Sequence, residues 1–387
     1  MSKKQRCLMM ESLPHEVVEC ILERLDADPL LRFKAVSKQW KSTIESPFFQ
    51  RRQFTQRQQS GNPDVLMVSR CADINSEIEA LTTLVLGSSS SVKIPTPWEE
   101  EEEEDKEYSV SQDSCDGLVC LFDNFKSGFV FNPATRWYHP LPLCQLQQLL
   151  IAIGDGFYDL GYRVSRLGFG KDKLTGTYKP VWLYNSIEIG LENATTCEVF
   201  DFSTNAWRYV SPAAPYRIVG CPAPVCVDGS LHWFTECEET KILSFDLHTE
   251  TFQVVSKAPF ANVDGFGFDI VMCNLDNRLC VSEMKLPNQV IWSFNSGNKT
   301  WHKMCSINLD ITSRWFGPTQ VCALLPLALL DGKKKKKKKK KKLLFYCRVR
   351  KRTMVVHDNE TKSYDVAFEA DSIGHPVCYF PSLISIS

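Results

Sequence analysis

Two kinds of hydrophobic spacing divide the chain. Over about the first fifty residues, apolar positions such as Val17, Ile21 and Leu25 recur every four residues, which predicts amphipathic helices. From about residue 110, short apolar runs alternate with Gly, Pro, Asn and Asp, which predicts strands joined by turns. The pattern therefore predicts a small helical module followed by a large all-β domain.

Three short helices are predicted in the first part of the chain. Pro14 and Pro29 each suit the first turn of a helix, where the missing N–H of proline has no intrahelical partner to lose. A third helix is indicated by the spacing from Val36 to Ile44, and it is expected to end at Pro47. So small a module cannot bury all of its apolar faces internally. The surplus is expected to face the rest of the chain or a partner.

A turn unit recurs along the predicted β domain. It consists of an Asp or Asn, then a Thr or Asn three residues later, then an aromatic residue two or three positions further on. The first side chain is suited to bonding the turn backbone, and the aromatic residue starts the next strand and packs across the hairpin. The unit begins at Asn132, Asp172, Asp201, Asp246, Asn295 and Asp358.

Repetition of this unit indicates a repeated architecture. A single hairpin is marginally stable in water, and hairpins repeated at about 30 to 60 residues are typical of propellers. We therefore predict an irregular β-propeller, with a large β-sandwich as the alternative. The run Pro381–Ile386 is predicted to be a closing strand that completes the first blade.

The net charge of −1 conceals two opposite runs. Seven acidic residues occupy Glu99–Asp105, and ten lysines occupy Lys333–Lys342. Each run repels itself, so loops are predicted at 99–107 and 333–342. We interpret the lysine run as an inert loop or a gene-model artefact rather than a nuclear signal. The remaining chain is mildly acidic, which argues against a general nucleic-acid surface.

The sequence offers little catalytic chemistry. The 16 cysteines include no C-x2-C pair, so neither a RING nor another zinc site is predicted. Many cysteines lie within apolar runs, where a reduced thiol acts as a small hydrophobic side chain. We predict no metal, no cofactor and no catalytic residue. Because no secretory signal and no membrane-spanning run is recognised, a cytoplasmic or nuclear location is expected.

The helical region resembles an F-box, and the β region resembles the F-box-associated, kelch-like domain of plant F-box proteins. The F-box resemblance rests on Leu13-Pro14, Ile21-Leu22, Leu25, Leu30-Leu31-Arg32-Phe33, Val36-Ser37-Lys38 and Trp40. The second resemblance rests on the order of Asp116-Gly117-Leu118-Val119-Cys120, Phe131-Asn132-Pro133, Gly168-Phe169-Gly170 and Gly229-Ser230-Leu231-His232-Trp233. We expect an F-box helical domain over 8–52, a linker with possible first strands over 53–95, and a propeller-like domain over 96–387.

This resemblance implies a non-catalytic, substrate-recognition adaptor of an SCF-type ubiquitin ligase. The F-box is expected to dock on a Skp1-like protein, and through it on the cullin and RING subunits, while the β domain binds a target protein for ubiquitination. Val36 and Trp40 fit either the docking surface or the core of the module. The positions that match the family's Skp1-facing residues are Leu13, Pro14, Ile21, Leu22, Leu25, Leu30 and Leu31.

The target is not identified by the sequence. Interface hot spots favour Trp, Tyr and Arg, which makes Tyr216, Arg217, Arg314, Trp315 and Phe316 the candidate target-binding residues, all predicted on loops. Two other functions remain open on sequence grounds. One is a non-degradative module that binds a protein or a glycan, and the other is an enzyme of the propeller type.

Overall fold

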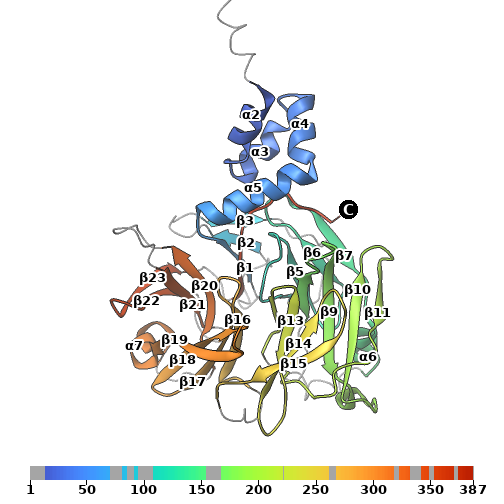
Figure 1. The fold of residues 1–387 in the computed structure, drawn as a ribbon, viewed down its shortest axis with the longest axis vertical. Coiled ribbons are helices and arrows are strands. Elements are labelled where there is room, and N and C mark those ends of the chain that lie inside the picture. The colour runs from blue at the N-terminus through green and yellow to red at the C-terminus, as the bar shows by residue number, and fades with distance from the viewer. Residues whose placement is uncertain are drawn as a thin grey trace, which may run out of the picture.

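A computed structural model describes most of the chain and confirms the predicted fold class (Figure 1). A small helical module precedes an all-β domain whose sheets are arranged around a ring. The described residues are 14–69, 81–84, 91–94, 108–153, 167–220, 222–260, 267–317, 322–331, 341–347, 353–369 and 374–386.

The helical module contains the three predicted helices and one more. They are α2 (His15–Leu22), α3 (Ala27–Phe33), α4 (Lys38–Glu45) and α5 (Pro47–Ser60). Pro47 does end α4, as predicted, but it is also the first residue of α5. The hydroxyl of Ser46 caps this helix by accepting a hydrogen bond from the N–H of Phe49 at 3.2 Å.

The β domain consists of six four-stranded antiparallel sheets. Contacts between successive inner strands run from β8 through β12, β16, β20 and β24 to β4, which makes the arrangement a propeller. From the inner strand outward, the sheets are β24 (Gly374–Tyr379), β1 (Asp64–Ser69), β2 (Leu81–Leu84), β3 (Ser91–Ile94); β4 (Ser109–Val110), β5 (Val119–Phe122), β6 (Gly128–Phe131), β7 (Tyr138–Leu141); β8 (Gly168–Lys171), β9 (Tyr178–Asn185), β10 (Thr195–Asp201), β11 (Ala206–Tyr209); β12 (Val225–Val227), β13 (Ser230–Phe234), β14 (Lys241–Asp246), β15 (Phe252–Lys257); β16 (Ile270–Asn274), β17 (Leu279–Lys285), β18 (Asn288–Asn295), β19 (Thr300–Asn308); and β20 (Leu325–Asp331), β21 (Lys341–Tyr346), β22 (Thr353–Asp358), β23 (Ser363–Glu369).

The strand that closes the ring is not the predicted one. β24 pairs with β1 from Asp64 opposite Tyr379 to Ser69 opposite Gly374, so the first sheet contains both ends of the β domain. Residues 381–386, predicted as the closing strand, form no strand. The possible first strands expected within 53–95 are present as β1, β2 and β3, while the described residues before them differ from a linker in that α5 continues to Ser60.

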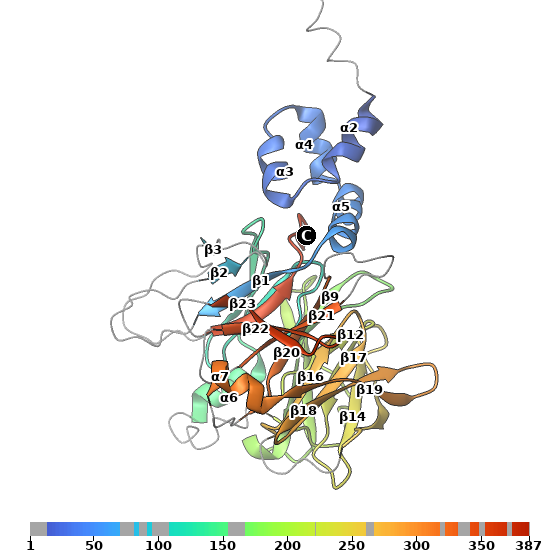
Figure 2. The ribbon, with the colours of Figure 1, turned by 90° about the vertical axis from the view of Figure 1, so that its left-hand side faces the viewer.

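The strand directions define two faces of the propeller. β24 ends and β1 begins beside α5. Counted from the inner strand of each sheet, the links from the first to the second strand and from the third to the fourth strand lie on this side of the propeller. We name this side the near face. The other links form the far face, which carries the 3-10 helix η3 (Ser186–Ile189), α6 (Gln145–Ile153) and α7 (Leu309–Phe316). Figure 2 shows α6 and α7 on the same side of the propeller.

All six predicted turn units are present on the near face. In each, the Asp or Asn carboxyl or amide oxygen accepts a hydrogen bond from the backbone N–H two residues later, at 2.8 to 3.1 Å. The aromatic residue also packs across the hairpin as predicted. The ring centroids are 5.3 Å apart for Phe200 and Trp207 and 4.7 Å apart for Phe245 and Phe252.

Of the two charge runs, the acidic one lies outside the described residues. The lysine run is described only at Lys341 and Lys342, and these begin β21 rather than belonging to a loop. Lys341 forms an ion pair with Asp276, and the ammonium of Lys342 lies 3.6 Å from the carboxylate of Asp358. The predicted loop 333–342 therefore does not include Lys341 and Lys342, which belong to a strand.

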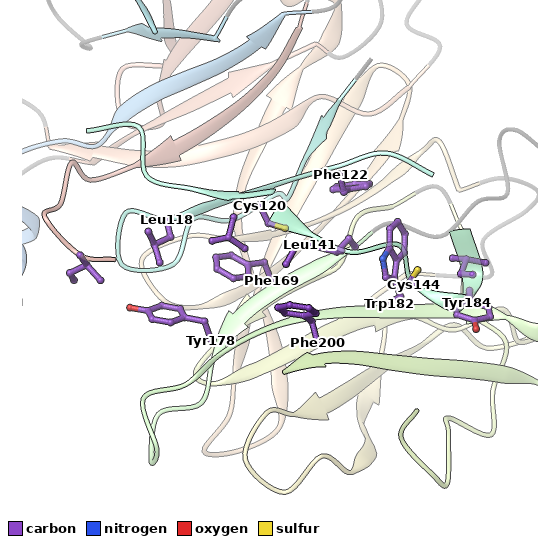
Figure 3. Close-up of a cluster of buried hydrophobic side chains, with 14 of the residues drawn as sticks. Leu118, Cys120, Phe122, Leu141, Cys144, Phe169, Tyr178, Trp182, Tyr184 and Phe200 are labelled. Atoms are coloured by element: carbon purple, nitrogen blue, oxygen red, sulfur yellow. The ribbon is translucent and has the colours of Figure 1, made fainter. Parts of the chain in front are cut away.

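Neighbouring sheets share hydrophobic cores. In the cluster of Figure 3, Phe122 on β5 meets Trp182 on β9 edge to face, with ring centroids 5.5 Å apart, and Phe200 on β10 packs in the same cluster. Cys120 and Cys144 are fully buried there as free thiols. The expectation that many cysteines act as small hydrophobic residues is confirmed at these positions.

Candidate functional site

Helix α2 presents an apolar stripe to solvent. Pro14 at its N-cap is exposed, Val17 is 43% exposed and Ile21 is 50% exposed. Spacings of three and four residues place the three side chains on one side of the helix. We name Pro14, Val17 and Ile21 the docking stripe. Val17 was not among the predicted positions, although its i, i+4 relation to Ile21 was the available signal.

The side of α2 next to this stripe faces the core of the module. Leu22 and Leu30 are almost completely buried and pack together with Ile44. Their predicted position on a partner-facing surface is therefore corrected, because neither side chain reaches that surface. Leu25 and Leu31 are partly buried against the same core. Leu13 lies outside the described residues.

Two further residues of the module were ambiguous in the sequence. Trp40 is partly buried and meets the ring of Phe33 edge to face at 5.6 Å between centroids. Val36 is 59% exposed. Trp40 therefore supports the core of the module, whereas Val36 adds to its exposed apolar surface.

The candidate target-binding residues lie in two links of the far face. Tyr216 and Arg217 lie between β11 and β12, where Lys241 lies 4.7 Å from the centroid of the Tyr216 ring and the Arg217 guanidinium donates a hydrogen bond to Glu236 at 2.8 Å. Both are partly exposed. Both side chains can therefore contact a partner on the far face, and Lys241 and Glu236 fix their orientations.

The other three candidates lie on helix α7 rather than on the predicted loop. Asn308 caps this helix by accepting a hydrogen bond from the N–H of Ile311 at 3.0 Å. Phe316 is buried against Phe345, with centroids 5.9 Å apart, so it belongs to the core and not to a binding surface. Arg314 is exposed and stacks over Trp315 at 3.9 Å.

The far face also exposes large apolar side chains that the sequence analysis did not single out. Leu286 between β17 and β18 is 70% exposed, and Ile187 on η3 is 64% exposed. Further members occur on other far-face links. They include Phe125, Ile151, Ile153, Phe268 and Ile311, and Leu191 lies on the same link as Ile187. Solvent-exposed apolar residues gathered on one face are typical of protein-binding surfaces.

On the near face, the link between β4 and β5 lies across the central mouth of the propeller. The Gln112 side chain donates to the carbonyl of Met272, and the Ser114 hydroxyl donates to the carbonyl of Cys378 at 2.9 Å. The carboxylate of Asp113 accepts from the N–H of Cys226, also at 2.9 Å. This one link therefore ties together the inner strands of three other sheets.

A cavity of about 690 Å³ remains at this mouth. Its charges are compensated by pairing, because Lys171 lies 2.5 Å from Asp116 and Lys173 pairs with Asp228. Burial raises the pKa of both the Cys226 and Cys378 thiols to about 12, so both are protonated and weakly nucleophilic near neutral pH. Over the described part of the chain, no cluster of three or more His, Cys, Asp or Glu is placed to hold a metal ion.

Asp113 makes the stability of the propeller depend on pH. Burial raises the pKa of its carboxyl group to about 7, and the hydrogen bond from Cys226 opposes that rise only in part. The folded protein thus retains a proton that the unfolded chain releases near pH 4. Stability from this group is present at low pH and is lost as the pH rises through about 7.

Asp113→Asn is therefore expected to stabilise the protein increasingly as pH rises. Asparagine keeps the acceptor for the Cys226 N–H but does not ionise, so the gain in free energy of unfolding should be about 1–3 kcal/mol larger at pH 8 than at pH 5. Urea denaturation of both proteins at the two pH values measures it. An equal difference at both pH values would show that Asp113 ionises normally.

Within the described residues, no helix is long and apolar enough to span a membrane.

Comparisons with known proteins agree with the two-part architecture. The F-box domain model matches residues 10–52, and the model described as F-box associated beta propeller domain matches residues 64–386. The second match begins with β1, which is why it starts before the predicted residue 96.

Close relatives occur in Arabidopsis thaliana. An F-box/LRR-repeat/kelch-repeat protein is 98% identical over 387 residues, which cover 100% of both chains. An F-box protein is 49% identical over 410 residues, covering 97% of this chain and 100% of the relative. Another is 52% identical over 397 residues, covering 98% and 85%. The chain therefore belongs to the F-box proteins that carry an F-box-associated β-propeller domain.

Proposed function

We propose that this protein is a non-catalytic substrate adaptor of an SCF-type ubiquitin ligase. The docking stripe binds a Skp1-like protein, which links the chain to the cullin and RING subunits, and the far face binds the target. The observation that carries this proposal is the presence of two separate exposed apolar surfaces on one chain, on the helical module and on the far face. Catalysis then arises from proximity, because the adaptor raises the concentration of target near the ubiquitin-conjugating enzyme.

The docking stripe is suited to a protein partner on energetic grounds. Complete burial of an aliphatic side chain contributes about 1.5–3 kcal/mol, and Val17 and Ile21 are about half exposed in the free protein. Leu25 and Leu31 are only partly buried against the core of the module, so they can add apolar contacts to such a partner. Association and ordering offset part of the gain, so these side chains should act as hot spots rather than as equal contributors.

We propose that the protein is located in the cytoplasm or the nucleus, where a ligase of this type would act. The described cysteines are free thiols, which suits a reducing compartment.

Ile21→Asp is expected to weaken binding to a Skp1-like protein about 100-fold or more, because it places a carboxylate in an apolar interface. The fold should be kept, since this side chain is exposed. Titration calorimetry with purified full-length protein measures the affinity. Leu174→Asp is the matched control, because Leu174 is 76% exposed on a near-face turn of the propeller.

Equal affinity of Ile21→Asp and the wild type would refute the docking assignment. The target half is tested with the same proteins as baits, together with Leu286→Asp on the far face. A protein that is captured by the wild type, lost with Leu286→Asp and ubiquitinated only when the Skp1-like protein can bind would support the adaptor. A captured protein that is never ubiquitinated would favour the non-degradative binding module.

A further inference from the structure

The last described residues of the chain lie between the two parts of the molecule. Residues 380–386, which we name the C-terminal tail, follow β24 without forming a strand. Both Figure 1 and Figure 2 show this end of the chain next to α5. The tail contacts the helical module with one side chain and the propeller with the next.

Leu383 belongs to the core of the helical module. It is 4% exposed and packs in the cluster that contains Leu22, Leu30 and Ile44. Ala134, from a near-face turn of the propeller, also packs against this cluster. The core of the helical module is therefore completed by residues from outside the module, Leu383 and Ala134.

Asn132 of the propeller holds the tail in place. Its fully buried side-chain amide donates hydrogen bonds to the carbonyls of Ser382 at 3.1 Å and Ile384 at 2.8 Å. The oxygen of the same amide accepts from the N–H of Ala134 at 2.9 Å and so closes the turn between β6 and β7. One side chain thus fixes both the turn on which the helices sit and the tail that enters their core.

The next residue of the tail packs into the propeller. Ile384 is 9% exposed and joins the cluster shared by the second and third sheets, to which Phe54 of α5 also contributes. Gly117 lies so close beneath the tail that a Cβ atom there would be 2.5 Å from the carbonyl oxygen of Phe380. The position of Leu383 is therefore determined by the folded propeller.

We propose that the C-terminal tail makes the fold of the helical module depend on a complete propeller, so that only a full-length chain presents a stable docking stripe. Helices of seven or eight residues such as α2, α3 and α4 are unstable without tertiary packing. Removal of a buried leucine leaves a cavity that the surrounding side chains fill only in part. The consequence for Skp1 binding rests on the proposed function, whereas the dependence of the fold does not.

Hydrogen exchange on the full-length protein tests the dependence directly. Leu383→Ala should accelerate exchange of the α3 and α4 amides about thirtyfold or more, a factor that corresponds to about 2 kcal/mol. Protection in β13 and β14, which lie in another part of the ring, should be unchanged. Ser385→Ala is the matched control in the same tail, because Ser385 is exposed.

A calorimetric titration with a Skp1-like protein accompanies the exchange measurement. Faster exchange of the helices together with weaker binding of Leu383→Ala, but not of Ser385→Ala, supports the inference. If the helices of Leu383→Ala exchange faster but neither the wild type nor either variant binds the Skp1-like protein, the inference is still supported. In that case the proposed function is refuted instead. Unchanged exchange in the helices, or an equal acceleration in β13 and β14, would overturn it.

Discussion

Deletion of residues 374–387 is expected to abolish cooperative unfolding of the propeller. The deletion removes β24, the inner strand of the first sheet, and leaves β1 paired only with β2, with its inner edge open along six residues. It also removes Val377 and Tyr379, which are almost fully buried. Because a ring has no alternative partner for β1, we expect an expanded chain with exposed apolar surface. Differential scanning calorimetry and binding of a hydrophobic dye measure the loss.

Deletion of residues 380–387 provides the control for this prediction. It keeps β24 and its ladder to β1, and should therefore keep a cooperative transition of the propeller, although at a lower temperature because Ile384 is lost from its cluster. A cooperative transition in both truncated proteins would show that the ring does not require β24.

Glu198→Ala is expected to lower the free energy of unfolding by about 2–4 kcal/mol, because it leaves three buried hydrogen-bond donors without their acceptor. Glu198 lies on β10, is 2% exposed and accepts hydrogen bonds from the N–H groups of Gln145 and Leu146 at 2.9 and 3.0 Å. These N–H groups start α6, where a carboxylate is favourable. The Tyr184 hydroxyl donates a third hydrogen bond at 3.0 Å. Urea denaturation at pH 7 measures the change.

Tyr184→Phe separates the charge from the hydrogen bonds in this network. It removes one hydroxyl and leaves the two helix N–H groups satisfied, so its cost should be about 1–2 kcal/mol. Equal costs for Tyr184→Phe and Glu198→Ala would mean that the carboxylate does not support α6. In that case α6 is held by the apolar packing of Leu146 and Leu150 and by the hydrogen bonds that the Gln147 amide donates to the carbonyls of Asp123 and Lys126.

Features with a short-range cause were predictable from the sequence. The turn beginning at Asp246 needs only its own side chain and the next three residues, and its Oδ1 does accept the expected N–H of His248 at 2.8 Å. The opening helices were indicated by their spacing in the same way. The sequence did not indicate which side of α2 faces solvent, because Ile21 and Leu22 are equally apolar neighbours and only the packing of α3 and α4 distinguishes them.

Features that depend on distant residues were not predictable in this way. β24 contains Pro376, which weakens its resemblance to a strand, whereas residues 381–386 are rich in apolar residues but form no strand. Pro47 was interpreted only as the end of a helix, although Ser46 and Pro47 are also the N-cap and the first residue of the next helix. The contact of Asn132 with Ser382 joins residues 250 positions apart, and no local pattern reports it.

The closure of the ring by β24 and β1 has a consequence for chains that end early. Val65 pairs with Cys378, so this ladder forms only after the chain has been synthesised beyond Cys378 and a long loop has been closed. Until then β1 offers an open edge of apolar residues, which is a template for intermolecular pairing. A chain that stops before β24 should therefore aggregate, rather than keep partial activity.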